Sequence, residues 1–170
     1  MLIIGNFGLS YGQSQAQMAL WSIMAAPLIM SSDLRVMENS FKEILQNKNL
    51  ISINQDSLGI MGQQFKQKYN GVEIWSKLLT NDYMAFVFYN PLPYGTPTNV
   101  KLGLKDLGLI KYSTYNLYES FSGNLIGQYN SKDNFNTTVN PSGSVFAFWA
   151  EPAQKRIKPA TKSSVRNRNN

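Results

Sequence analysis

The hydrophobic pattern of this chain changes its period once, near residue 59, and that change limits the possible folds more than any other feature. Before residue 59, apolar residues recur at helical spacing between short apolar runs, which is typical of β/α units. After it, apolar and polar residues alternate, and turn signals recur about every eight to twelve residues, as in antiparallel sheets. We therefore expect two structured parts, residues 1–58 and 59–152, followed by a disordered basic tail at residues 153–170.

The first part predicts two short strands, each followed by a helix. The apolar runs at residues 2–4 and 28–30 are the expected strands, and Ser10-Tyr11-Gly12-Gln13 matches the capping box that begins a helix. That helix should continue to about Ala25. A second helical pattern is carried by Phe41, Ile44, Leu45, Ile51 and Ile53. Strands that alternate with helices are typically parallel and buried on both faces. Because a (β/α)8 barrel takes about 250 residues, this part is only about a quarter of one and cannot close by itself.

The second part predicts an antiparallel β-sandwich. Asn70-Gly71 lies between two alternating segments, which is a strong signal for a β-hairpin. Eight short strands are expected, at residues 63–68, 72–78, 83–89, 100–104, 114–118, 125–129, 135–139 and 145–150. One aromatic cluster should stabilise them, formed by Trp75, Phe86, Phe88, Phe146, Phe148 and Trp149. Short strands separated by regular turns are the usual pattern of such a sandwich.

Composition excludes several kinds of chemistry within these 170 residues. There is no Cys and no His, which excludes thiol nucleophiles, disulfides, Cys/His zinc sites and Ser-His-Asp triads, and no metal or cofactor motif is present. The net charge of +6 comes from the tail, where six basic residues follow Gln154 without an acidic one. No aromatic residue or nucleic-acid motif accompanies them, so a solvated tail is favoured over a basic binding patch. No signal peptide is recognisable, and no apolar run reaches the length of about eighteen residues needed to span a membrane.

Several motifs of the first part carry a family resemblance. They are Met1-Leu2-Ile3-Ile4-Gly5-Asn6-Phe7-Gly8-Leu9-Ser10, Gln17-Met18-Ala19-Leu20-Trp21, Ala25-Ala26-Pro27-Leu28, Ser32-Asp33-Leu34-Arg35 and Ile53-Asn54-Gln55-Asp56. With these motifs the chain resembles the α-galactosidase and α-N-acetylgalactosaminidase family of retaining glycoside hydrolases. Residues 61–150 match more loosely, mainly through Asn140-Pro141-Ser142-Gly143. The resemblance implies the last two β/α units of a catalytic (β/α)8 barrel followed by an antiparallel β-domain.

The resemblance also implies which functional residues are missing. The family's nucleophile and its acid/base are two aspartates on earlier barrel strands, which this chain does not contain. Met1 alone carries over, as an apolar wall of the galactose pocket. The full-length protein would remove terminal α-linked galactose or N-acetylgalactosamine by double displacement, as a lysosomal homodimer, whereas this chain alone should be inactive.

No pair of carboxylates in the chain is a convincing substitute. A retaining glycosidase needs two carboxyl groups about 5 to 5.5 Å apart. Asp33 follows the second expected strand, where barrel enzymes place catalytic groups, but Asp33-Leu34-Arg35 suits a helix N-cap or an ion pair equally well. Asp56 is expected in a turn between the two parts, and Glu38 and Glu43 on the wet side of a helix.

Two further features leave alternatives open. The aromatic residues of the second part suit either core packing or a sugar-stacking platform. The apolar strands around Trp75 and Trp149 favour core packing. The choice stays open for Tyr112, Tyr115 and Tyr118, because a tyrosine tolerates a half-exposed sheet face. A non-catalytic sugar-binding or interaction module is therefore the alternative function. Asn136-Thr137-Thr138 is a glycosylation sequon, and strand alternation is expected to point Asn136 into solvent.

Overall fold

The computed structural model describes residues 1–65 and 68–153. The expected basic tail, residues 153–170, lies outside the described residues apart from Ala153. Three α-helices are described: α1 (Tyr11–Ile23), α2 (Asn39–Leu45) and α3 (Lys48–Asn54). Within the described ranges, no helix is long and apolar enough to cross a membrane.

The capping box predicted for the first helix is confirmed. The Ser10 hydroxyl accepts from the Gln13 amide at 3.2 Å, and the Gln13 side chain accepts from the Ser10 amide at 3.0 Å. The helix ends at Ile23, two residues earlier than expected, because Ala25 adopts a left-handed φ of 51° that a helix cannot continue. The second helical pattern is divided into α2 and α3, since the Asn47 side chain caps a new helix by accepting from the Leu50 amide.

The two strands expected at residues 2–4 and 28–30 are reduced to a single parallel bridge. Leu2 pairs with Met30, with the Leu2 amide donating to the Ile29 carbonyl and the Ser31 amide donating to the Leu2 carbonyl, each at 2.7 Å. The parallel direction is as predicted, but the strand lengths are wrong. A ladder here ends quickly because Gly5 turns with a φ of 84° and Pro27 has no amide hydrogen to donate.

Among the described residues eight β-strands follow, and each lies where the alternation predicts it to within a few residues. They are β1 (Gln63–Gln64), β2 (Glu73–Leu78), β3 (Met84–Asn90), β4 (Thr98–Gly103), β5 (Thr114–Glu119), β6 (Leu125–Asn130), β7 (Asn134–Val139) and β8 (Ser144–Pro152). A one-turn 3-10 helix, η1 (Thr80–Asp82), joins β2 to β3. Only β1 is much shorter than predicted. The Asn70-Gly71 turn is confirmed, with both residues at positive φ and Tyr69 and Val72 exchanging two hydrogen bonds of 2.9 Å.

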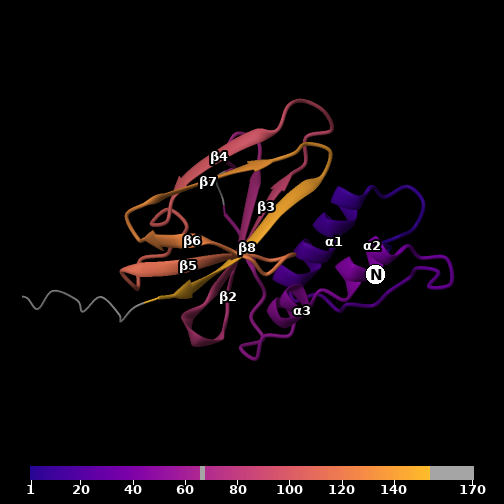
Figure 1. The fold of residues 1–170 in the computed structure, drawn as a ribbon, viewed down its shortest axis with the longest axis horizontal. Coiled ribbons are helices and arrows are strands. Elements are labelled where there is room, and N and C mark those ends of the chain that lie inside the picture. Colours follow the sequence, from indigo (N-terminus) through magenta and orange to yellow (C-terminus); the bar gives the residue numbers. More distant parts are fainter. Residues whose placement is uncertain (66–67, 154–170) are drawn as a thin grey trace, which may run out of the picture.

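The strands form two antiparallel sheets that enclose one core. Six pair in the order β1-β2-β3-β8-β5-β6, and β4 pairs with β7 alone. Figure 1 shows β4 and β7 on one side of the larger sheet and the three helices toward the other. Between the two sheets, Phe148 packs against Phe86, Phe88 and Phe135 with ring centroids 4.9 to 5.4 Å apart. This arrangement confirms the predicted sandwich.

A second core lies between the helices and the outer face of the six-stranded sheet. Met18, Ala19 and Ile23 of α1 share this cluster with Ala85 and Val87 of β3 and Ala147 of β8. The small side chains on the sheet let α1 approach closely, so β3 and β8 are buried on both faces.

The single aromatic cluster expected from the sequence is therefore wrong, because successive strand residues point to opposite faces. Phe86, Phe88, Phe146 and Phe148 belong to the inner core, while Trp75 and Trp149 pack on the helix side.

Candidate functional site

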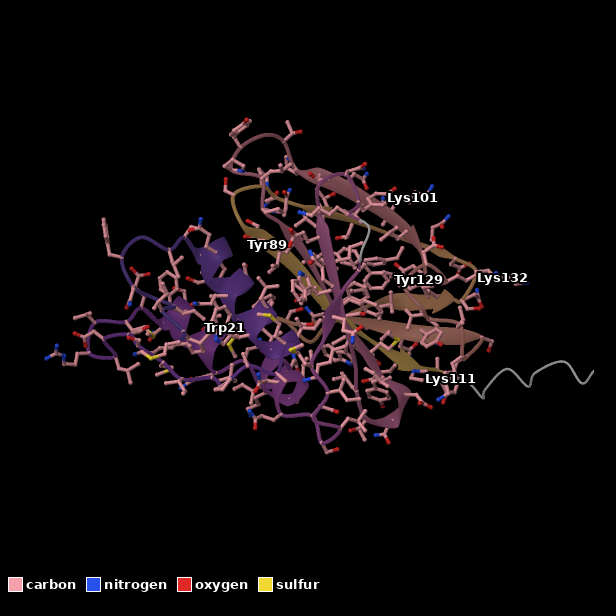
Figure 2. The ribbon with its side chains drawn as sticks, turned by 180° about the vertical axis from the view of Figure 1, so that it is seen from behind. Trp21, Tyr89, Lys101, Lys111, Tyr129 and Lys132 are labelled. Carbon is pink, nitrogen blue, oxygen red and sulfur yellow. The ribbon has the colours of Figure 1, made fainter. Side chains whose placement is uncertain are left out.

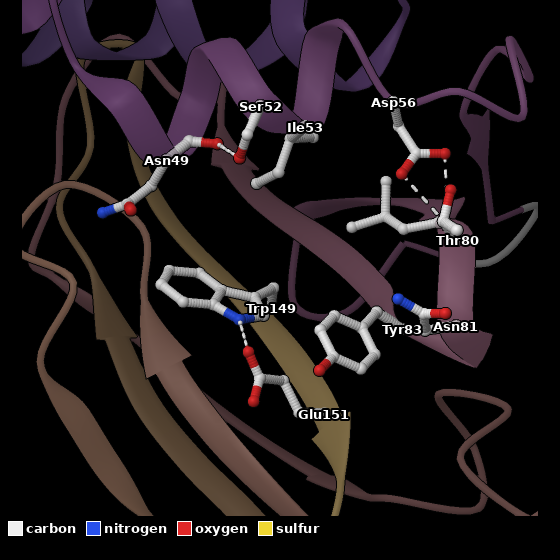
Figure 3. A pocket seen from close by; sticks show the side chains of 10 residues that line it. Asn49, Ser52, Ile53, Asp56, Thr80, Asn81, Tyr83, Trp149 and Glu151 are labelled. Carbon is white, nitrogen blue, oxygen red and sulfur yellow. Dashed lines mark hydrogen bonds between the residues drawn. The ribbon is translucent and has the colours of Figure 1, made fainter.

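A cleft of about 310 Å³ opens between α3 and the outer face of the six-stranded sheet (Figure 3). We call it the α3 cleft. Its lining comes from α3 and a residue two positions beyond its end, from η1 and its flanks, and from β8: Asn49, Ser52, Ile53, Asp56, Leu79, Thr80, Asn81, Tyr83, Trp149 and Glu151. α3 is two turns long, and its Asn49, Ser52 and Ile53 side chains form the helix side of the cleft.

Asp56 connects the end of the helical part to η1. Both carboxylate oxygens accept from the Thr80 amide, at 3.2 and 3.0 Å, and one also accepts from the Leu58 amide at 3.1 Å. Partial burial raises the pKa of Asp56, but the hydrogen bonds from Thr80 and Leu58, with the nearby Lys77 ammonium, outweigh it and hold that pKa below its usual value. The expected turn role is confirmed, and the structure adds a bond across to the sandwich.

Lys77 is a buried cation beside this cleft. Its side chain is 1% exposed and extends from β2 toward the C-terminal end of α3, where Nζ donates to the Ile53 and Asn54 carbonyls. Burial lowers the pKa of Lys77, and the Asp56 carboxylate opposes that shift. A positive charge at a helix C-terminus is favourable because the last carbonyls carry partial negative charge.

Two aromatic rings and a carboxylate form the sheet side of the cleft. The Trp149 indole nitrogen donates to Glu151 Oε1 at 2.9 Å, and Tyr118 stacks on Trp149 with centroids 5.1 Å apart and planes inclined by 13°. In Figure 3 the Tyr83 ring lies beside Trp149, with its hydroxyl on the side of Glu151. Burial, followed by the nearby Glu151 carboxylate and Tyr118, raises the pKa of Tyr83, so its hydroxyl stays protonated at neutral pH.

Asp33 lies in an ion pair, as one of the two interpretations predicted. Its oxygens accept from Arg35 Nε at 2.9 Å and from a terminal guanidinium nitrogen at 2.7 Å. The alternative N-cap role is wrong, because α2 begins six residues later with Glu38 at its N-cap. The side-chain hydrogen bond from Arg35 lowers the pKa of Asp33. Asp33 does not line the α3 cleft that contains Asp56, and Glu38 and Glu43 are exposed as expected.

The other expected site residues lie apart from this cleft. Met1 is 64% exposed, and its carbonyl accepts from the Gln17 side chain at 3.4 Å. Asn136 is exposed on β7 between buried Phe135 and half-buried Thr137, as the alternation predicts, and it pairs with Lys101 of β4. Figure 2 shows Lys101, Lys111 and Lys132 at the far end of the sandwich from Trp21, which lies on α1.

The sequence pattern leaves Tyr115 undecided between the core and a half-exposed sheet face. In the structure it is 2% exposed in the inner core, and its hydroxyl accepts from the Tyr112 amide at 3.0 Å. The α3 cleft could not be predicted from the sequence pattern, because its lining residues come from three distant segments. The only available signal was local: Trp149 and Glu151 are two apart in a strand and so share a face. Over residues 1–65 and 68–153, no group of His, Cys, Asp and Glu side chains is placed to hold a metal ion.

Comparisons with known proteins cover both parts of the chain. The profile of Alpha galactosidase A matches residues 1–56, and that of the Alpha galactosidase A C-terminal beta sandwich domain matches residues 59–143. Alpha-N-acetylgalactosaminidase of Gallus gallus is 45% identical over 148 residues, covering 85% of this chain and 36% of that protein. Human Alpha-galactosidase A is 46% identical over 108 residues, covering 64% and 25%.

Solved structures support the same architecture. Alpha-galactosidase I from Mortierella vinacea matches with a TM-score of 0.79 at 19% identity, covering 89% of this chain and 38% of that one. The alpha-galactosidase of Saccharomyces cerevisiae matches with a TM-score of 0.78 at 17% identity, covering 89% and 46%. The chain spans about a third of the length of the alpha-N-acetylgalactosaminidases that it matches. Taken with the two profile matches, the 45% identity across both parts shows that the chain belongs to the Alpha galactosidase A family of glycosidases.

Proposed function

We propose that this chain is the C-terminal part of a glycoside hydrolase that removes terminal α-linked galactose or N-acetylgalactosamine from glycoconjugates by a retaining double displacement. The observation that carries the proposal is the 45% identity to an alpha-N-acetylgalactosaminidase across 148 residues, which include both the helical part and the sandwich. A non-catalytic sugar-binding module accounts for the sandwich but gives no reason for the family match over residues 1–56.

In this proposal residues 1–58 are the last two β/α units of a (β/α)8 barrel, and residues 59–152 are the sandwich domain. The parallel pairing of Leu2 with Met30 supports the barrel assignment, because adjacent barrel strands are parallel. So does the exposure of large apolar side chains in this part, which further barrel units would cover; they include Met1, Phe7, Ile29, Leu34 and Val36.

The chemistry then depends on carboxylates from outside this chain. Asp33 is bound by Arg35 and Asp56 by two backbone amides, so neither is placed as a free nucleophile or acid. Met1, at the end of the Leu2 bridge, is proposed to form an apolar wall of the sugar pocket. The family relationship further supports a homodimer that is delivered to the lysosome, and the exposed Asn136 sequon suits a secretory route.

A chimera tests the proposal directly. The matching stretch of the Gallus gallus enzyme is replaced by this chain, and hydrolysis of a nitrophenyl α-N-acetylgalactosaminide is measured. We expect the kcat/KM of the chimera to lie within about tenfold of that of the parent enzyme, which corresponds to about 1.4 kcal/mol in activation free energy. The change should be this small because the two parts of the active site would come from two related proteins. Met1→Ala in the chimera should raise KM more than it lowers kcat, because it removes a binding contact.

The parent enzyme truncated before the exchanged stretch is the control and should be inactive. A chimera that is monodisperse and unfolds cooperatively but shows no turnover on either the galactoside or the N-acetylgalactosaminide would overturn the proposal.

A further inference from the structure

We propose that the α3 cleft binds a neutral hexopyranose on the sandwich, with Trp149, Tyr83 and Glu151 as its recognition residues. This inference goes beyond the proposed hydrolysis, and it rests on contacts within the described residues.

The Trp149 ring is fixed before any ligand arrives. Tyr118 stacks on it, and the Glu151 carboxylate accepts its indole hydrogen at 2.9 Å. A pyranose ring has one face rich in C–H groups, which packs well on the electron-rich surface of an indole. Because the indole ring is already oriented, a ligand that binds it orders few side chains. The entropy cost of binding is then small, and weak stacking can contribute to affinity.

Polar groups around the ring suit hydroxyl-rich ligands. The Tyr83 hydroxyl, the second Glu151 oxygen and the Asn81 amide line the cleft, and none has a hydrogen-bond partner among the residues that the structure describes. Together they provide donors and acceptors on neighbouring sides of the cleft, as Figure 3 shows for Tyr83 and Glu151. A sugar with adjacent hydroxyl groups can satisfy several of them at once, whereas an apolar ligand would leave them unpaired.

Charge and size narrow the ligand class. The carboxylates of Asp56 and Glu151 both line the cleft, which disfavours phosphorylated or acidic ligands. A metal ion is disfavoured because the described side chains form no cluster of three suitable ligands. A volume of about 310 Å³ is at the lower end for small-molecule sites and suits one sugar unit.

Saturation-transfer NMR on the 170-residue chain tests the proposal, with methyl α-galactoside, methyl α-glucoside and methyl α-mannoside as probes. We expect transfer to the ring protons of at least one of them. Tyr83→Phe keeps the ring and removes only the hydroxyl. It should therefore raise Kd about fivefold, which is the effect expected for one lost hydrogen bond. Glu151→Gln keeps an acceptor for Trp149 and should also weaken binding.

Tyr94→Phe, in an exposed loop, and Glu43→Gln, on α2, are the matched controls and should bind like the original chain. The proposal is overturned if no probe receives saturation, or if Tyr83→Phe and Glu151→Gln bind as tightly as the controls. Thermal unfolding of each variant separates a lost contact from a lost fold. Because this experiment measures binding by the chain and the chimera measures hydrolysis, either proposal can fail while the other stands.

Discussion

The Lys77 ammonium donates to the Ile53 carbonyl at 2.5 Å, which joins strand β2 to the C-terminal end of α3. The two residues are 24 positions apart and belong to the two parts that the sequence pattern separates. A second bond, to the Asn54 carbonyl at 3.3 Å, places the cation over the last turn of the helix. The helical part and the sandwich are thus held together by a buried polar contact as well as by apolar packing.

Lys77→Met should destabilise the chain. The substitution keeps most of the side-chain volume but leaves two buried carbonyl groups without their donor, at a cost of about 2 kcal/mol in the free energy of unfolding. Urea denaturation with a constant m-value measures this change. Lys68→Met is the control, because its exposed pair with Glu73 should contribute less than about 1 kcal/mol. Equal losses of unfolding free energy in the two variants would mean that the buried Lys77 contact stabilises the chain no more than the exposed Lys68 pair.

Asp56 should make the stability of the chain sensitive to acid. Its pKa is lower in the folded chain than in the unfolded one, so its contribution is complete above the unfolded value of about 3.9 and is lost as the pH falls through the lower folded value. Asp56→Asn should flatten the fall of unfolding free energy in that window. The comparison is made in an Asp33→Asn background, because the pKa of Asp33 is lowered too. If the slope of unfolding free energy against pH is unchanged in Asp56→Asn, the lowered pKa of Asp56 in the folded chain is contradicted.

The isolated chain should not hydrolyse a nitrophenyl α-galactoside above the buffer background. Asp33 is bound to Arg35 and Asp56 to backbone amides, and a double displacement needs a free nucleophile and a separate acid. The measurement is release of nitrophenol by protein that has been purified twice. Turnover that survives repurification and disappears in Asp33→Asn would instead identify Asp33 as catalytic.

Asn136 should carry an N-glycan when the protein is made in animal cells with a secretory leader. The residue is exposed on β7, and the acceptor sequence Asn136-Thr137-Thr138 is intact. Asn136→Gln should remove one glycan from the mass measured before and after glycosidase treatment. Asn134→Gln, on the same exposed face but outside a sequon, should leave the mass shift unchanged. An unmodified Asn136 peptide in secreted material would refute the prediction.

The positions of most elements could be predicted because their signals are local. The Ser10 and Gln13 side chains cap their own helix, Asn70-Gly71 forms its own turn, and alternation on β7 determines that Asn136 is exposed. The strands at residues 2–4 and 28–30 were overestimated for the opposite reason. A parallel strand depends on partners distant in sequence, and here only Leu2 and Met30 pair.

The sequence by itself determined where most of the helices and strands lie, which faces of the strands are apolar, and that His and Cys chemistry is excluded. Only the tertiary structure decided that Trp75 and Trp149 face the helices, that Lys77 is buried at the end of α3, and that Asp56, Tyr83 and Trp149 line one cleft. Periodicity reports the faces of an element but not what covers each face. The layer that covers each face depends on how the sheets and helices pack. β3 and β8 are covered on both sides, and the identity of an apolar residue on them does not indicate which layer it contacts.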